Sequence, residues 1–138
     1  MRDGKEPVGK AYVDCVRAFA KDSLDFVLVD GGYRDSCMSV IPEYIRPGGL
    51  LILDNANWYL PSNTQSPCSR AKEQGPISPA WKKFMDVSAR WACIWTTNGV
   101  VDTALYVKPC AQETNPLDPF FEEELRKLRV VWWRRQAG

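Results

Sequence analysis

The sequence contains no histidine among its 138 residues. Histidine is the usual general base of serine and cysteine hydrolases and the commonest protein ligand for zinc and related metals. Catalysis of the Ser-His-Asp or Cys-His type, and any histidine-ligated metal centre, are therefore excluded within this chain. Acid–base chemistry must rely on Asp, Glu, Lys, Tyr or water. A metal must be held by oxygen ligands, which favours a hard ion such as Mg²⁺ or Ca²⁺.

Other common signatures are missing as well. The five cysteines form no C-x-x-C pair, which argues against a disulfide framework or a zinc site. No apolar run is long enough to span a bilayer, and the first ten residues contain no apolar signal region. The net charge of +1 gives no electrostatic case for nucleic acid or an anionic membrane as partner. These features predict a cytoplasmic globular protein.

Residues 24–59 (LDFVLVDGGYRDSCMSVIPEYIRPGGLLILDNANWY) are the most informative stretch that is present. Two apolar runs end in acidic residues, Asp30 and Asp54, and a helix-length segment lies between them. Continuous apolar runs are typical of parallel strands that are buried on both faces, so residues 26–29 are predicted to be such a strand. A strand–helix–strand unit brings both carboxylates to one edge of the sheet, where ligands bind in open α/β folds.

Apolar spacing and turn residues predict the remaining elements. Helices are expected over residues 9–21, over residues 35–45 with Pro42 inside, and from Ser78-Pro79 to Trp91. Pro47-Gly48-Gly49 predicts a turn. The long segment 55–78 is predicted to be either a lid over a binding site or a plain connector.

Two strands close the predicted domain. Residues 92–96 and 103–107 flank Asn98-Gly99, a strong signal for an antiparallel hairpin. Residues 1–110 are therefore predicted to form the domain, and residues 111–138 a linker and a charged terminal helix. The apolar stripe of that helix is predicted to pack back on the sheet or to bind a partner. The residues of the stripe are Phe120, Phe121, Leu125, Leu128, Trp132 and Trp133.

This order of elements resembles the C-terminal half of a class I S-adenosylmethionine-dependent methyltransferase. The segments DFVLVDG, IRPGGLLILDN and WTTNGVVDTALYVKP carry the resemblance, which covers roughly residues 10–109. The resemblance implies an α/β fold with a partial Rossmann-like methyltransferase sheet, strands 4 to 7, that ends in an antiparallel hairpin and is followed by a C-terminal helix. It also implies S-adenosylmethionine as the cofactor, with Asp30 and Gly31 at its binding edge.

Within that class the sequence is most similar to the metal-dependent O-methyltransferases of the catechol and caffeoyl-CoA type. By this resemblance, Asp30, Asp54 and Asn55 hold a divalent cation such as Mg²⁺, which orients an acceptor hydroxyl and lowers its pKa. The family carries a lysine three residues after the first of these. Here Tyr33 stands at that position and Arg34 follows it, and these two are the catalytic candidates. The alternative interpretation is that the Asp and Asn side chains cap the segments that follow.

Trp58 and Tyr59 are predicted to line the acceptor pocket, with loop anchoring as the alternative role. The chain has no glycine-rich G-x-G-x-G loop and no sequence for the first three strands of such a sheet. One hypothesis is a methyltransferase for a small-molecule hydroxyl that lacks its N-terminal half, is inactive alone and needs a complementing chain. The other is a non-catalytic methyltransferase-like binding module, able to form a homo-oligomer through the exposed edge of the strand at residues 26–29. The antiparallel hairpin argues against other doubly wound nucleotide-binding folds.

Overall fold

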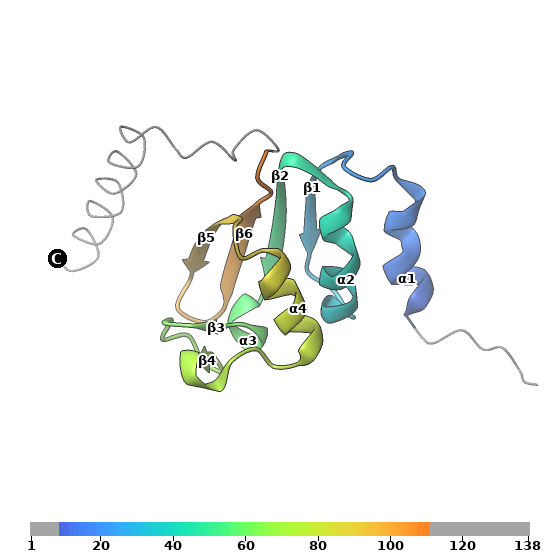
Figure 1. Cartoon of the computed structure of the whole chain (residues 1–138). Helices are drawn as coiled ribbons and strands as arrows, with labels where there is room; N and C mark the ends of the chain where they lie inside the picture. Colours follow the sequence, from blue (N-terminus) through green and yellow to red (C-terminus); the bar gives the residue numbers. More distant parts are fainter. Residues whose placement is uncertain (1–8, 111–138) are drawn as a thin grey trace, which may run out of the picture.

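The computed structural model describes residues 9–110 and contains a four-stranded sheet, a two-stranded sheet and four α-helices (Figure 1). The predicted linker and terminal helix at residues 111–138 lie outside the described residues. The helices are α1 (Lys10–Asp14), α2 (Arg34–Val40), α3 (Ala56–Tyr59) and α4 (Pro79–Val87). The strands are β1 (Leu24–Val29), β2 (Ile45–Asp54), β3 (Pro61–Ser62), β4 (Arg70–Ala71), β5 (Ala92–Thr97) and β6 (Asp102–Val107). Short 3₁₀ turns occupy Cys15–Ala18, Ile41–Glu43 and Lys72–Gln74.

The order of strands in the main sheet is β1-β2-β6-β5. Strands β1 and β2 are parallel, whereas β6 is antiparallel to both of its neighbours, β2 and β5. The α2 helix connects the two parallel strands, as the strand–helix–strand pattern predicted. This arrangement confirms the predicted fold class, a mixed α/β fold with a partial Rossmann-like sheet that ends in an antiparallel hairpin.

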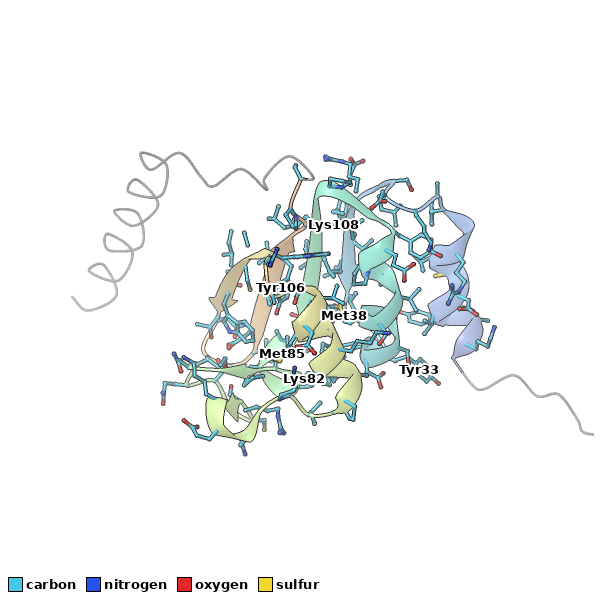
Figure 2. All side chains as sticks on the ribbon, in the orientation of Figure 1. Tyr33, Met38, Lys82, Met85, Tyr106 and Lys108 are labelled. Atoms are coloured by element: carbon cyan, nitrogen blue, oxygen red, sulfur yellow. The ribbon has the colours of Figure 1, made fainter. Side chains whose placement is uncertain are left out.

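One face of the main sheet carries the hydrophobic core. Helices α2 and α4 lie in front of this face in Figure 1, and α1 lies beside α2. Met38 of α2, Phe84 of α4 and Tyr106 of β6 are buried between the helices and the sheet. Met38 and Tyr106 are labelled in Figure 2. No helix within residues 9–110 is long and apolar enough to cross a bilayer.

The opposite face of the sheet is open in the described part of the chain. Phe26 and Leu28 of β1 are 65% and 56% exposed, and Ile94 of β5 is 57% exposed. The prediction that β1 is buried on both faces is therefore wrong for residues 9–110. Side chains of a strand alternate between the two faces, and a continuous apolar run is buried on both only where a second layer covers it.

The boundary between α2 and β2 also differs from the prediction. The helix ends at Val40, because Pro42 has no N–H to continue it, and a 3₁₀ turn follows. Strand β2 then begins at Ile45 and includes the predicted turn at Pro47-Gly48-Gly49, where Gly48 has a φ of 75°. A side chain at Gly49 would lie 2.8 Å from the carbonyl oxygen of Arg46, so a glycine is required where the strand is irregular and its register with β1 shifts.

A buried polar network ties the segment between α3 and α4 to the β5–β6 hairpin. The Asn57 side chain donates to Ser69 Oγ (3.0 Å) and accepts the backbone N–H of Asp102 (3.0 Å). The Asp102 carboxylate, fully buried, accepts hydrogen bonds from Ser66 Oγ and from Trp95 Nε1 (2.7 Å). Burial raises the pKa of Asp102, but the hydrogen bonds from Ser66 and Trp95 outweigh it and hold the pKa below its ordinary value. Hydrogen bonds at Ser66 and Ser69 therefore hold the middle of the segment between α3 and α4 against the hairpin.

Candidate functional site

The carboxyl ends of β1 and β2 lie at the same edge of the sheet, the edge that also carries α3 and the β3–β4 pair (Figure 1). After each strand the chain turns through a residue in the left-handed region, Tyr33 with φ 53° before α2 and Asn55 with φ 55° before α3. This conformation is unfavourable for a bulky residue such as Tyr. Such positions gather at sites where the surrounding structure fixes the backbone, and both residues are themselves predicted site residues.

Arg34 joins the two strand ends. Its Nη2 donates to Asp30 Oδ1 after β1 (3.0 Å) and to Asn55 Oδ1 after β2 (3.0 Å). The Nη1 atom lies 3.5 Å from the hydroxyl of Tyr59, and the guanidinium carbon is 5.9 Å from the centre of the Tyr59 ring. The Arg34 side chain is only 15% exposed, and its Nε is buried without a hydrogen-bond partner in the described structure. A positive charge is therefore held between two strand ends.

Tyr59 connects this cluster to the hydrophobic core through a series of aromatic contacts. Its ring stacks on Trp81 of α4 with centroids 4.8 Å apart. Trp81 meets Phe84 edge to face at 6.2 Å, and Phe84 meets Tyr106 of β6 in the same way at 5.1 Å. Burial raises the pKa of Tyr106, so its phenol stays neutral at physiological pH. The position of Arg34 is thus supported by packing that extends across α4 to the centre of the sheet.

The three predicted metal ligands take part in different hydrogen bonds. Asp54 Oδ1 accepts a hydrogen bond from Thr103 Oγ1 of β6 (3.0 Å), whereas Asp30 and Asn55 share Arg34. No three His, Cys, Asp or Glu residues within 9–110 lie close enough to hold a metal ion. A divalent ion on Asp30 and Asn55 would compete with the guanidinium for Asp30 Oδ1 and Asn55 Oδ1. The metal site stays a prediction that needs its own test.

The alternative interpretation, in which these side chains cap the following segments, is wrong for Asn55. Asn55 stands at the N-terminus of α3 but makes no side-chain hydrogen bond to that helix. Its amide oxygen accepts the hydrogen bond from Arg34 instead.

The remaining predicted site residues surround the cluster. A Cβ atom on Gly31 would lie 2.5 Å from the hydroxyl of Tyr12, so Tyr12 of α1 lies directly over this turn. The Tyr33 ring packs against Gly9 and lies 6.3 Å from the Tyr12 ring. Trp58 is 40% exposed, next to the site. The roles predicted for Asp30 and Gly31 with the cofactor, and for Trp58 with the acceptor, stay predictions.

Sequence reasoning missed Tyr12, Asn57 and Asp102. Nothing in their local sequence marks them, because their partners are distant in the chain: the hydrogen bond between Asn57 and Asp102 spans 45 residues. A shallow hollow of about 390 Å³ next to α3 was also unforeseen. None of its lining residues belongs to the Arg34 cluster. They are Ser62, Asn63, Thr64, Gln65, Ser69, Arg70, Ala71, Lys72 and Glu73.

Comparison with known proteins finds only distant similarity, to solved structures and not to any sequence. No protein-family model matches the sequence, and no curated protein matches it. An O-methyltransferase family protein from Burkholderia thailandensis aligns with a TM-score of 0.43 and 12% identity, over 72% of this chain and 35% of that protein. A possible exported protein from Bordetella parapertussis aligns with a TM-score of 0.40 and 14% identity, over 69% of this chain and 42% of that protein. The chain thus spans less than half the length of each.

Proposed function

We propose that this chain supplies the acceptor side of an S-adenosylmethionine-dependent methyltransferase that methylates a hydroxyl of a small molecule. The observation that carries the proposal is the position of Arg34. In a sheet of the predicted topology, Arg34 fixes a positive charge at the ligand-binding edge, between Asp30 and Asn55.

The residues at this edge have complementary chemical roles in the proposed reaction. S-adenosylmethionine supplies an electrophilic methyl group, and the protein must align an acceptor oxygen with it. As the acceptor hydroxyl gives its proton to water, the guanidinium of Arg34 stabilises the negative charge on the oxygen, a task that a metal ion performs in other sites. The oxygen then bonds the methyl carbon as the bond from that carbon to sulfur breaks, and S-adenosylhomocysteine leaves. Asp30 and Asn55 orient Arg34, and the exposed ring of Trp58 offers a flat surface for an aromatic acceptor.

In the proposed enzyme, S-adenosylmethionine is bound mainly by another segment or another chain. The sequence has no glycine-rich loop for the cofactor, and Tyr12 lies over Gly31 at the predicted cofactor edge. We expect the 138-residue chain alone to show no appreciable binding of S-adenosylmethionine in calorimetry. Micromolar binding by the chain alone would contradict this division of roles.

The decisive test begins with the genomic sequence upstream of the codon for Met1. A reading frame that encodes a glycine-rich strand–turn–helix would be joined to this chain, and the longer protein assayed with methyl-labelled S-adenosylmethionine and a panel of phenols and catechols. We expect methyl transfer, and an approximately hundredfold lower kcat for Arg34→Ala with unchanged cofactor affinity. Arg90→Ala, at an exposed site beyond α4, is the matched control. A longer protein that binds the cofactor but methylates none of these acceptors, or an Arg34→Ala variant of undiminished kcat, would sink the proposal.

A second candidate function is a non-catalytic binding module. The observation in its favour is that β1 is an edge strand, with no strand on its outer side in the described structure. An edge of this kind pairs readily with a strand of another chain. Light scattering over a concentration series distinguishes the candidates when combined with the upstream sequence. A stable oligomer without any upstream cofactor half favours the module, and a monomer under the same conditions counts against it.

A further inference from the structure

The register of the main sheet gathers eight apolar side chains on the open face. Paired residues of neighbouring strands face the same side, so Phe26, Leu50, Val107 and Ala92 form one row across the sheet, and Leu28, Ile52, Leu105 and Ile94 form the next. None of the eight is fully buried in the described structure. These residues are called the open face below.

An uncovered surface of this composition is unusual for a folded protein. Monomeric proteins rarely leave contiguous apolar patches of more than a few hundred Å² in contact with water, and larger ones mark interaction sites. No charged side chain interrupts the two rows of the open face. A layer of matching apolar side chains is therefore needed to cover it.

The sequence outside the described residues contains a segment that matches this face in pattern and length. Phe121, Leu125, Leu128 and Trp132 recur at intervals of four, three and four residues, which places them on one side of a helix. At 1.5 Å per residue, this stripe is about 16 Å long. Four strands spaced by about 4.8 Å make a sheet about 14 Å across, so the stripe spans all four.

The point where this segment begins is fixed close to the open face. Lys108 follows Val107, which belongs to the open face, and its Nζ donates to the backbone oxygens of Pro42 (3.0 Å) and Ile45 (2.9 Å) and to Asp22 (2.7 Å) (Figure 2). The seven residues 111–117 can extend about 23 Å from there. A helix packs on a sheet at a separation near 10 Å, so the connection is long enough to reverse direction and lie on the sheet.

We propose that residues 118–135 form an amphipathic helix that docks on the open face of its own chain, with Phe121, Leu125, Leu128 and Trp132 against the sheet. The helix supplies a second layer over the face of β1 that is exposed within residues 9–110, and it leaves the charged residues of the segment in solvent. This inference does not rest on the proposed methyltransferase activity.

Limited trypsin digestion of the full chain tests the docking directly. Arg126, Lys127 and Arg129 are cleavage sites within the segment, and a docked helix protects them. We expect Leu28→Asp on the open face to raise the cleavage rate at these sites about tenfold or more. Val100→Asp is the matched control, because Val100 is 61% exposed in the hairpin turn and lies outside the open face.

A second pair of variants keeps the test valid if Leu28→Asp fails to fold. Leu128→Asp changes the docking stripe, and Val130→Asp changes the opposite side of the same predicted helix. Only Leu128→Asp is expected to accelerate cleavage. A Leu28→Asp/Leu128→Asp double variant should be cleaved no faster than either single variant, because both remove the same contact.

Three results would overturn the proposal. One is cleavage of the segment in the unmodified chain as rapid as in Leu28→Asp. Another is an equal effect of Leu128→Asp and Val130→Asp. The third is protection that disappears on dilution together with a dimer detected by light scattering, which would assign the open face to a second copy of the chain.

Discussion

The guanidinium of Arg34 lies between two oxygen atoms that belong to different strand ends, Asp30 Oδ1 and Asn55 Oδ1. Both oxygens are of the type that Mg²⁺ prefers, so the same pair can serve either a bound metal or an arginine. The arginine has a permanent charge and donates in a fixed planar geometry. At the scale of single residues, we predict that this one side chain takes the place of a metal ion at the edge of the sheet.

We predict that the unmodified chain gains no thermal stability from millimolar Mg²⁺ or Mn²⁺, because Arg34 occupies the oxygens and repels a second cation. Arg34→Ala should lose about 1–2 kcal/mol of stability, since it removes hydrogen bonds to a partly exposed carboxylate. The variant should also bind Mn²⁺ more tightly than the unmodified chain. Thermal melts and Mn²⁺ electron paramagnetic resonance measure the two effects.

Arg90→Ala is the control for the loss of one positive charge, and it should change neither the melting temperature in Mg²⁺ nor the binding of Mn²⁺. A metal-dependent rise in the melting temperature of the unmodified chain would reverse the conclusion. Asp30, Asp54 and Asn55 would then hold a divalent ion, with Arg34 displaced, as the family resemblance implied.

At the scale of elements, the local signals in the sequence placed several elements well. The hairpin around Asn98-Gly99 became β5 and β6, and the Ser78-Pro79 start became α4. Both depend on residues adjacent in the chain. Elements that depend on contacts were predicted less well. The turn predicted at Pro47-Gly48-Gly49 lies within β2, as an irregular stretch between the pairs Leu24–Ile45 and Phe26–Leu50.

The candidate site also has features that the sequence predicts and features that it does not predict. The acidic residue after each strand was predictable, because the end of an apolar run is visible in the sequence. The link that Arg34 makes between Asp30 and Asn55 was not predictable, since Arg34 and Asn55 are separated by 21 residues and meet only after the strands pair. The Asn57–Asp102 contact was unpredictable for the same physical reason.

Asp102 joins secondary-structure elements, because it connects α3 and the following segment to the β5–β6 hairpin. We predict that Asp102→Asn lowers the free energy of unfolding at pH 7 by about 2 kcal/mol, because it disturbs the bonds from Ser66 and Trp95. The pKa of Asp102 is lower in the folded chain than in the unfolded chain, where it is about 3.9. Its contribution is therefore fully present above pH 3.9 and disappears as the pH falls through the folded pKa.

Urea unfolding at pH 7 and at several values between pH 5 and pH 3 measures both parts of this prediction. The unmodified chain should lose more stability than Asp102→Asn over the acidic range. Asp86→Asn is the control, since Asp86 is exposed and pairs with Lys82 at the surface of α4, and it should change stability by about 0.5 kcal/mol or less. Equal acid sensitivity of Asp102→Asn and the unmodified chain would contradict the assignment.

At the scale of the whole molecule, the core in residues 9–110 lies on one side of the sheet, and Trp81 is its largest fully buried side chain. Trp81 contacts both Tyr59 near the candidate site and Phe84 near the sheet. We predict that Trp81→Ala costs about 3–5 kcal/mol, a large share of the 5–15 kcal/mol typical of a domain. Calorimetry should show a much lower melting temperature, with loss of the near-ultraviolet circular dichroism.

Ile77→Ala is the control for this prediction, because Ile77 is 51% exposed just before α4. It should leave the melting temperature nearly unchanged. A Trp81→Ala variant that melts cooperatively at the original temperature would show that the aromatic contacts do not hold the molecule together.

The position of β6 has a consequence for the order in which the molecule assembles. β6 is the last described strand to be synthesised, yet it lies in the middle of the sheet between β2 and β5. During synthesis, β1, α2 and β2 can pair as soon as they emerge, but β5 has no partner in the sheet until β6 arrives. The nascent chain therefore carries β5 unpaired until β6 emerges, and in that interval the edge of β5 is open to strands of other chains.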